Sequence, residues 1–314
     1  TDDVTRIVLR RFPLDGALAG PAWLCDPTRR DAACRKLGLP RSVFDVLAYK
    51  PERRLVMVAS SDARPLAVVK CYDETGYAHA LHAHQALASV DGLMVRSATA
   101  WNASRHTIAT PWIEGRLLSV AHDPVYLFGI AGERLADIHN APLSLRDAES
   151  EELAQVGLHR IVHAVAHWAP SSRDAMQRIV RQLAALRQEE FVEAVPIHGD
   201  FYTKQILLGP DGVWLLDFDE CAMADPHIDL ALFVAHLERD VLRATCTRER
   251  AESVIATLLG GYGRSRPIDL RRLTWRTAEA MLRLAPHPFR HRDPDWPALT
   301  SRLVARAEAL LDTL

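Results

Sequence analysis

The stretch from residue 198 to residue 229 constrains this chain more than any other part of its sequence. It opens with a His-Gly-Asp triplet that ends at Asp200, and the side-chain amide of Gln205 follows shortly after it. A second acid, Asp217, comes directly after the last of two short apolar segments. An acid, an amide and another acid therefore occur in a fixed order around a short region of predicted structure.

The two apolar segments predict a β-hairpin. They cover residues 205–208 and 213–216, and a Gly-Pro-Asp-Gly sequence at 209–212 separates them. Tight turns favour these residue types, and short apolar runs on either side of such a turn are typical of paired strands. The hairpin would hold Gln205 and Asp217 side by side at the ends of rigid elements.

Oxygen-bearing side chains in this order suit phosphoryl transfer. In that reaction a protein mainly positions an acceptor hydroxyl in line with the phosphate and neutralises charge with metal ions. Asp200 could take the hydroxyl proton, while Gln205 and Asp217 offer the oxygen ligands that Mg²⁺ prefers. Each acid by itself could equally cap a helix or form an Asx-turn. The triplet, the amide, the hairpin and the second acid together favour the catalytic interpretation.

These residues resemble two motifs of the aminoglycoside phosphotransferase and choline kinase family, HGDxxxxN and [IL]DF/W[DE]. The resemblance implies an α+β, two-lobed protein-kinase-like fold, with a small antiparallel-sheet N-lobe and a larger, mainly helical C-lobe. It implies that Asp200 is the catalytic base and that Asp217 is a magnesium ligand, with Asp219 either behind the metal ligands or facing the substrate. The chain has Gln205 where the family usually has asparagine, so the extra methylene predicts a shifted metal site.

Two further residues of the stretch take structural roles by the same resemblance. Asp229 lies in an Ala-Asp-Pro-His-Ile-Asp-Leu-Ala sequence at 224–231 that is similar to the family's GDPxxDLA. It is expected to brace the catalytic loop rather than touch the substrate. His198 is expected to pack beneath the loop, because a single histidine near an apolar segment is more often a core residue than a catalyst.

The N-terminal part predicts an antiparallel meander with a phosphate-binding lysine. Strand-like runs cover residues 42–49, 53–60 and 66–72, with short turn sequences between them. Lys70 ends an Ala-Val-Val-Lys sequence in the third run, which resembles the V-A-I-K strand whose lysine reaches the α and β phosphates. The alternative for Lys70 is a solvated charge at the end of a strand.

The same region departs from the kinase pattern in two ways. No G-x-G-x-x-G precedes Lys70, and the family often lacks one too. The helix expected over residues 77–90 has histidines where a glutamate should pair with Lys70, so Asp73, Glu74 or a weaker contact would replace that ion pair. The histidines lack the cysteine or acidic neighbours of a metal site, which disfavours that interpretation.

The segment after this helix resembles the connector that holds adenine. A strand is expected over residues 95–100, and Gly115 matches the glycine at which the family's chain turns into the helical lobe. Because Pro111 has no N–H to donate, its carbonyl is the expected acceptor and the N–H of Ile113 the expected donor. The predicted division is therefore an N-terminal nucleotide-binding lobe over 1–111, a hinge at about 111–115, and a catalytic and substrate lobe over 112–314.

Length and composition support a soluble two-lobed enzyme. The chain has 314 residues, 48% of them hydrophobic, and a formal net charge of −2, which gives no general attraction to nucleic acid or anionic membrane. Its five cysteines form no CxxC pair, as expected for reduced thiols. No stretch predicts a membrane span or a signal peptide. We therefore expect a cytoplasmic protein, with no prediction for its oligomeric state.

The rest of the chain predicts helices. Apolar residues recur at helical spacing in six segments, which cover residues 126–139, 173–191, 228–243, 249–262, 270–284 and 296–314. Residues 2–11 could form a strand, and residues 21–37 a loop and a short helix.

The acceptor is less constrained than the reaction. The resemblance implies ATP and Mg²⁺ as cofactors and a hydroxyl of a small molecule, such as a sugar, amino sugar, aminoglycoside or similar metabolite, as acceptor. Acids after Asp217 would suit a polycation, whereas the arginines of residues 264–292 would suit a neutral or anionic acceptor if they faced the pocket. The preferred interpretation is that those arginines form a solvated face. Trp275, Trp296, Tyr262 and Phe289 are candidates for an aromatic cage around a choline-type acceptor.

Two alternatives to a small-molecule kinase remain. The unusual Gln205 and the missing helix glutamate would also fit a non-catalytic, pseudokinase-like nucleotide-binding or regulatory module. Phosphorylation of proteins is disfavoured, because no activation segment ending in A-P-E follows Asp217.

Overall fold

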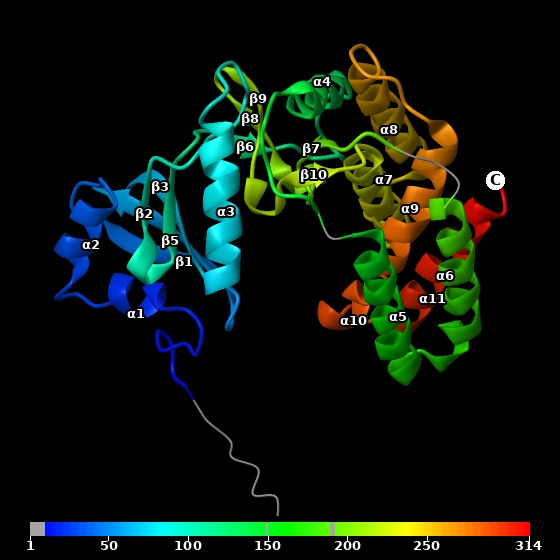
Figure 1. Ribbon diagram of the computed structural model, residues 1–314, viewed down its shortest axis with the longest axis horizontal. Helices are drawn as coiled ribbons and strands as arrows, with labels where there is room; N and C mark the ends of the chain where they lie inside the picture. Colours follow the sequence, from blue (N-terminus) through cyan, green and yellow to red (C-terminus); the bar gives the residue numbers. More distant parts are fainter. Residues whose placement is uncertain (1–9, 149, 189–191) are drawn as a thin grey trace, which may run out of the picture. The chain divides into compact units, whose positions relative to one another are not determined.

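The computed structural model describes residues 10–148, 150–188 and 192–314, and the chain divides into two compact units. The first unit comprises residues 1–91 and 95–114, and the second comprises residues 92–94 and 115–314. Each unit contains its own β-structure and its own helices (Figure 1).

An antiparallel sheet organises the first unit. Its strand order is β1-β2-β3-β5-β4, with every neighbouring pair antiparallel. The strands are β1 Val43–Lys50, β2 Arg54–Ser61, β3 Arg64–Tyr72, β4 Ala100–Asn102 and β5 Thr107–Pro111. The predicted three-strand meander is confirmed, with each strand displaced by at most two residues at either end.

Helices cover both faces of this sheet. Side chains alternate in burial along β2, and its inward residues Leu55, Met57 and Ala59 pack with Trp23 and Leu24 on one face. That face belongs to α1 (Gly20–Leu24) and α2 (Arg30–Lys36). Helix α3 (Glu74–Leu87) packs its apolar side against the opposite face (Figure 1).

The strand predicted over residues 95–100 is wrong, since regular pairing in this part of the chain starts only at β4. The reason lies in the preceding residues. Leu215 N–H donates to the carbonyl of Met94 (3.0 Å), so the chain at Met94 is bound to another strand. The first hydrogen bond to β5 comes from Thr99 N–H, which donates to Ala109 O (3.0 Å).

Short strands and 3₁₀ turns position the loops of the second unit. A three-stranded sheet has the order β6-β8-β9, and β7 pairs with β10. The strands are β6 Arg116–Leu117, β7 Val195–Ile197, β8 Ile206–Gly209, β9 Gly212–Leu215 and β10 Ala222–Ala224. The 3₁₀ turns η3 (Thr203–Gln205) and η4 (Phe218–Glu220) flank the β8–β9 hairpin.

Helices supply most of the second unit's core. The helices are α4 Tyr126–Asn140, α5 Glu151–Trp168, α6 Arg173–Gln188, α7 His227–Leu242, α8 Arg248–Tyr262, α9 Leu270–Leu284, α10 His287–Arg290 and α11 Trp296–Leu311. Buried apolar side chains of α5, α6, α9 and α11 form one cluster around Trp275, whose exposed fraction is 1%. Helices α5 and α6 lie next to each other in Figure 1.

Two of the described helices, α5 and the short α10, were not predicted from the sequence. The start of α5 nevertheless carries a recognisable signal, because Ser150 caps it by accepting a hydrogen bond from Leu153 N–H (3.3 Å) and two glutamates follow in the first turn. The predicted strand over residues 2–11 lies outside the described residues up to residue 9. Arg10 and Arg11 are in no strand. The end of the helix predicted over 173–191 also lies outside them beyond residue 188.

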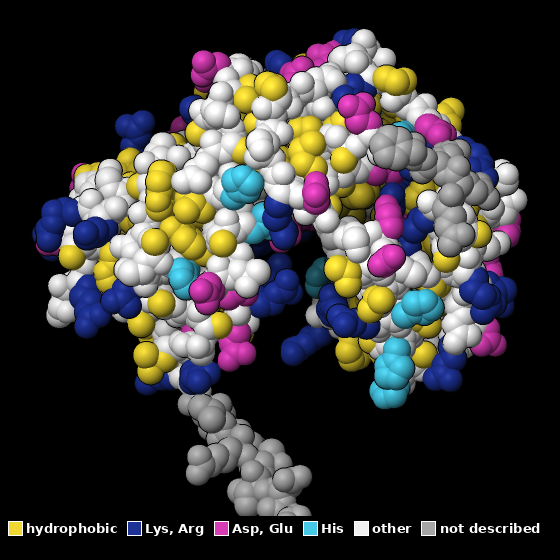
Figure 2. Space-filling view, in the orientation of Figure 1, with side chains coloured by type: hydrophobic (Ala, Val, Ile, Leu, Met, Phe, Trp, Pro, Cys, Tyr) yellow, Lys and Arg dark blue, Asp and Glu magenta, His cyan; other side chains and the backbone are white. Residues whose placement is uncertain are grey.

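The described surface mixes both signs of charge. Figure 2 shows Lys and Arg interspersed with Asp and Glu on the visible face of each unit. No helix that the structure describes could span a lipid bilayer.

Candidate active site

The loop that contains Asp200 is fixed by a single buried carboxylate. Strand β7 leads into the loop, and Asp229, in the first turn of α7, is fully buried beneath it. One oxygen of Asp229 accepts from His198 N–H (2.6 Å), and the other accepts from Gly199 N–H (2.8 Å). The predicted bracing role of Asp229 is confirmed.

A histidine and a tyrosine extend this bracing network. His139, in α4, lies 3.0 Å from Asp229 through Nε2 and 2.9 Å from the Tyr262 hydroxyl through Nδ1. Burial lowers the pKa of His139 and outweighs the hydrogen bond to Asp229, which would raise it. Burial also raises the pKa of Tyr262 to about 12. The neutral imidazole therefore donates its Nε2–H to Asp229 and accepts the Tyr262 O–H at Nδ1.

His198 is a structural residue, as predicted. It is fully buried, and its Nε2–H donates to the carbonyl of Leu216 (2.7 Å). Its Nδ1 accepts from the backbone N–H of Asp200 (3.3 Å), and its ring lies 4.5 Å from that of Phe218. The histidine thus joins the Asp200 loop to the segment that leads into Asp217.

Only glycine fits at position 199 without a shift of the backbone. Its φ is +81°, and a Cβ atom there would lie 2.3 Å from the carbonyl oxygen of Glu220. The backbone of the Asp200 loop therefore packs directly on η4, the turn that contains Asp219 and Glu220.

The predicted metal ligands lie at the two open ends of the β8–β9 hairpin. Gln205 directly precedes β8 and Asp217 follows β9, and the pairing of Gly209 with Gly212 closes the hairpin at its other end. Leu216 N–H donates to the carbonyl of Gln205 (2.9 Å), which ties the two ends together. The structure thus brings the backbones at both predicted ligand positions together.

The residues at these ends fit a magnesium site. The Gln205 side chain is buried, with 7% of the residue exposed. Asp217 has φ +63° and ψ +65°, a left-handed conformation that is uncommon for aspartate and concentrates at functional sites. An amide oxygen and a carboxylate leave positions for water and phosphate oxygens, as magnesium prefers. Asp219, in contrast, is 5% exposed within η4.

Lys70 lies in the interior of the first unit's sheet. It pairs with Val56 of β2 and Ile108 of β5 and is half-buried. Asp73, one of the acids considered for it, caps α3 by accepting from Gly76 N–H (2.7 Å). The helix consequently starts at Glu74, three residues earlier than predicted.

The connector has a backbone donor in the predicted position. Pro111 ends β5, and Trp112 N–H donates to the carbonyl of Leu66 (2.9 Å). Within the described residues, the N–H of Ile113 has no hydrogen-bond partner. Gly115 then joins the second unit, where a Cβ would lie 2.4 Å from the carbonyl oxygen of Leu208.

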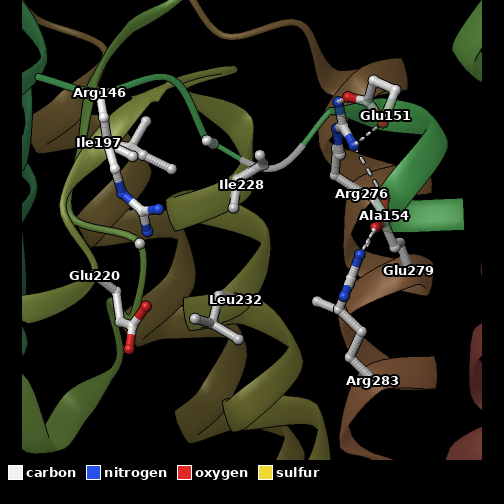
Figure 3. Close-up of a pocket in the computed structure, with 14 residues that line it drawn as sticks. Arg146, Glu151, Ala154, Ile197, Glu220, Ile228, Leu232, Arg276, Glu279 and Arg283 are labelled. Atoms are coloured by element: carbon white, nitrogen blue, oxygen red, sulfur yellow. Dashed lines mark hydrogen bonds and ion pairs between the residues drawn. The ribbon is translucent and has the colours of Figure 1, made fainter. Parts of the chain in front are cut away.

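A pocket of about 430 Å³ opens beside the Asp200 loop within the second unit. Gly199 and Glu220 form part of its lining, α7 contributes Ile228 and Leu232, and α9 contributes several charged residues (Figure 3). Two other lining residues, Arg146 and Glu151, belong to no motif that points to the site from the sequence.

The interpretation of the C-terminal arginines as a solvated face is wrong for Arg272 and Arg276. Each is 5% exposed, and both bind the carboxylate of Asp225, at 3.3 Å and 2.9 Å. Arg276, Glu279 and Arg283 lie on the pocket side of α9. Their spacing of three and four residues, which places them on one helix face, was a signal that the sequence contained.

Comparison with known proteins agrees with the motifs. A model of the phosphotransferase enzyme family matches residues 37–276, which include Lys70 and the whole stretch from His198 to Asp229. No curated protein matches the chain.

Solved structures share the fold. Choline kinase LicA from Streptococcus pneumoniae has a TM-score of 0.62 at 15% identity, covering 89% of this chain and 98% of that one. A choline kinase from Cryptosporidium parvum Iowa II has a TM-score of 0.69 at 11% identity, with coverage of 92% and 96%. The amicoumacin kinase hAmiN has a TM-score of 0.63 at 13% identity, with coverage of 84% and 88%. With the family match over most of its length and the kinase-like fold of these structures, this chain belongs to the phosphotransferase enzyme family.

Proposed function

We propose that this protein is an ATP- and Mg²⁺-dependent phosphotransferase that phosphorylates a hydroxyl of a small molecule. The observation that carries the proposal is the Asp200 loop, held by Asp229 and lying beside a pocket. Among the similar structures, hAmiN was solved with AMP-PNP, LicA with AMP, and an aminoglycoside phosphotransferase with GDP, which supports nucleotide use. The proposal covers a sugar, an amino sugar, an aminoglycoside or a similar metabolite as acceptor.

Each proposed role is supported by where the residue lies in the fold. Asp200 would orient the acceptor hydroxyl and take its proton, because its loop borders the pocket. Gln205 and Asp217 would hold Mg²⁺ at the open end of the hairpin. When bound, ATP supplies the phosphoryl group, and Mg²⁺ neutralises negative charge on the phosphates. Asp219 would support the loop from its buried position.

The nucleotide contacts belong to the first unit. Lys70 would orient the phosphates from β3, and the carbonyl of Pro111 and the N–H of Ile113 would contact the adenine edge. We propose a cytoplasmic setting, as expected of a chain whose five cysteines are all unpaired. The division into a nucleotide-binding lobe over 1–111 and a catalytic lobe over 112–314 is part of the same proposal.

A comparison of three aspartate variants tests the proposal. ATP consumption would be measured against a panel of sugars, amino sugars, aminoglycosides, choline-like amines and hydroxy acids. We expect Asp200→Asn to lower kcat by about 10³-fold or more with nearly unchanged nucleotide affinity, and Asp217→Ala to lose both turnover and magnesium-dependent nucleotide binding. Asp211→Asn, in the exposed turn of the same hairpin, is the matched control and should behave as wild type.

Two results would count against these roles. Equal loss of turnover and nucleotide binding in Asp200→Asn would remove its assignment as the base. Magnesium-independent nucleotide binding, with no acceptor-dependent turnover by the wild type, would favour the non-catalytic module. Two features motivate that alternative. Position 205 is a glutamine, and the only acid of α3 is its first residue, Glu74, so no acid lies further along the helix to pair with Lys70.

A further inference from the structure

The pocket beside the Asp200 loop has two walls of different character. Figure 3 shows Arg146 and Glu220 on one side of Ile228 and Leu232, and Arg276, Glu279 and Arg283 on the other. The first wall belongs to the loop side of the pocket, where Gly199 also contributes to the lining. The second wall belongs to α9, with Glu151 of α5 beside it.

Three guanidinium groups converge on one carboxylate in the α9 wall. Glu279 lies 3.0 Å from Arg276, 2.9 Å from Arg283 and 2.7 Å from Arg187 of α6. Burial alone would raise the pKa of Glu279, but the three arginines outweigh it and lower the pKa to about 2. The carboxylate is therefore ionised in the folded protein, and Glu151 and Asp225 supply further negative charge to Arg187 and Arg276.

Arg283 is the member of this group that can meet a ligand. The side chains of Arg187 and Arg276 are each 6% exposed, whereas that of Arg283 is 38% exposed. Arg283 uses Nε and Nη2 on the same oxygen of Glu279, and its Nη1 has no hydrogen-bond partner in the described part of the chain. An arginine with a spare donor at the edge of a pocket is suited to bind a carboxylate.

The opposite wall carries charge of both signs. Glu220 is exposed, and its carboxylate forms no ion pair with any residue that the structure describes. The side chain of Arg146 points into the pocket (Figure 3), and its carbonyl accepts from Met223 N–H (2.8 Å), which fixes its backbone on β10. A ligand between the walls thus meets a carboxylate near the Asp200 loop and guanidinium groups from both sides.

The aromatic residues considered for a choline cage lie elsewhere. The guanidinium of Arg276 covers Trp275 at 4.1 Å, and Tyr262 contacts His139. Phe289 and Trp296 lie against each other at 5.1 Å. Among the described residues, the pocket lining is aliphatic and charged without an aromatic ring, so a quaternary ammonium would find no π face there.

We propose that the acceptor is a small hydroxylated carboxylic acid whose carboxylate binds Arg283. An amino group on the acceptor would face Glu220 on the opposite wall. This inference rests on the proposed phosphotransferase function and narrows its acceptor to compounds that carry a carboxylate.

Matched pairs of compounds that differ only in the carboxylate test this inference. The pairs are L-homoserine and 3-aminopropan-1-ol, 4-hydroxybutyrate and butane-1,4-diol, and D-gluconate and D-sorbitol. Turnover with Mg·ATP would be measured, and binding with Mg·AMP-PNP would be measured by calorimetry. In at least one pair we expect the carboxylate to be preferred about tenfold or more, in line with a charge-assisted hydrogen bond.

Arg283→Met identifies the group responsible. Glu279 keeps Arg187 and Arg276 in this variant, so the α9 wall should fold as before. We expect the preference for the carboxylate to fall about tenfold through KM or Kd, with kcat changed much less. Arg290→Met is the control, because Arg290 is exposed on α10 and does not line the pocket.

Equal behaviour of both members in every pair, or a preference retained by Arg283→Met, would overturn the inference. The proposed function fails separately. A carboxylate that binds through Arg283 but is never phosphorylated would keep the pocket assignment and remove phosphoryl transfer. Turnover of neutral or amine acceptors without any carboxylate preference would do the reverse.

Discussion

Single residues fix the geometry of the Asp200 loop. The two oxygens of Asp229 hold consecutive backbone N–H groups, at His198 and Gly199. The backbone of Glu220 also lies directly against Gly199, so no side chain fits between them. A left-handed aspartate at position 217 ends the neighbouring hairpin. Small steric changes here should therefore affect activity more than stability.

Gly199→Ala tests the close contact with Glu220. The new Cβ would lie 2.3 Å from the carbonyl oxygen of Glu220 at a φ of +81°, so the loop has to move. We expect a loss of kcat of about 10²-fold, together with about 1–3 kcal/mol of unfolding free energy. Steady-state kinetics and urea denaturation measure the two effects.

Gly92→Ala is the matched control. Its φ is +84°, and nothing lies within 4 Å of the added Cβ, so it carries the backbone strain without the clash. We expect wild-type kcat and a destabilisation of about 1 kcal/mol. A similar loss of kcat in both variants would show that the contact with Glu220 is not what positions the loop.

At the scale of elements, the Tyr262–His139–Asp229 chain connects α8, α4 and α7 to the loop. Each member comes from a different helix, and all three are at most 2% exposed. Helices α4 and α8 approach so closely that a Cβ on Gly261 would clash with the backbone carbonyl oxygen of Gly129. The relative placement of the three helices therefore fixes the loop.

Tyr262→Phe would remove the hydroxyl at the far end of this chain. The buried Nδ1 of His139 would then lack its donor, and we expect a loss of about 1–2 kcal/mol in unfolding free energy with only a few-fold lower kcat. Tyr126→Phe on α4 is the control, because Tyr126 is 61% exposed and should lose nothing measurable. Equal stability of the two variants would argue that Tyr262 does not support His139.

The sequence predicted the elements that carry strong local patterns. The β8–β9 hairpin follows from its turn residues, and α9 has the predicted bounds because its apolar spacing is regular. The strand predicted over residues 95–100 was wrong because the chain at Met94 pairs with the β8–β9 hairpin instead of β5. Tertiary contacts, not local sequence, decide that pairing. The start of helix α5 carries a cap and an acidic first turn, both local signals of a helix N-terminus.

The candidate site was predictable in its motif but not in its pocket. The His-Gly-Asp triplet identified Asp200 as the candidate base. The predicted hairpin placed Gln205 and Asp217 close to each other. The burial of Arg276 depends on partners from other elements, Asp225 and Glu151, which lie about 51 and 125 residues away in sequence. Charge alone cannot distinguish such an arginine from a solvated one.

At the scale of the whole molecule, buried histidines link stability to pH. Burial lowers the pKa of His139, and burial together with the charges of Arg239, His287 and Lys204 lowers the pKa of His236 to about 2. Both stay neutral in the folded protein, whereas each binds a proton in the unfolded chain below its ordinary pKa of 6.5. Their stabilising contribution is therefore present above pH 6.5 and is lost as the pH falls.

We expect protonation of His236 alone to lower the unfolding free energy by about 2 kcal/mol between pH 7 and pH 5. Glu279 does not contribute over this pH range, since its pKa of about 2 lies below its ordinary value of 4.5 and its stabilising contribution is lost only in stronger acid. Chemical denaturation at a series of pH values measures how the unfolding free energy changes with pH, that is, the slope of its pH profile. A flat profile from pH 7 to pH 5 would contradict the neutral assignment of His236.

His236→Phe is the informative variant for this slope. The imidazole Nδ1 has no hydrogen-bond partner among the described residues, and the ring stacks on Tyr202 at 4.3 Å. Phenylalanine keeps the stack and cannot titrate, so the slope between pH 7 and pH 5 should become shallower than in the wild type. An unchanged slope would assign the pH dependence to other groups.

The convergence of Arg187, Arg276 and Arg283 on Glu279 also limits how this protein can diverge. A lineage that lost Glu279 alone would remove one of the carboxylates that these buried guanidinium groups share. Among the described carboxylates, Arg187 would keep only Glu151, and Arg276 only Glu151 and Asp225, which is destabilising. Descendants should therefore keep or exchange Glu279, Arg187 and Arg276 as a block. Arg283, which is more exposed, is free to be replaced by itself, so new acceptor preferences should arise first at that position.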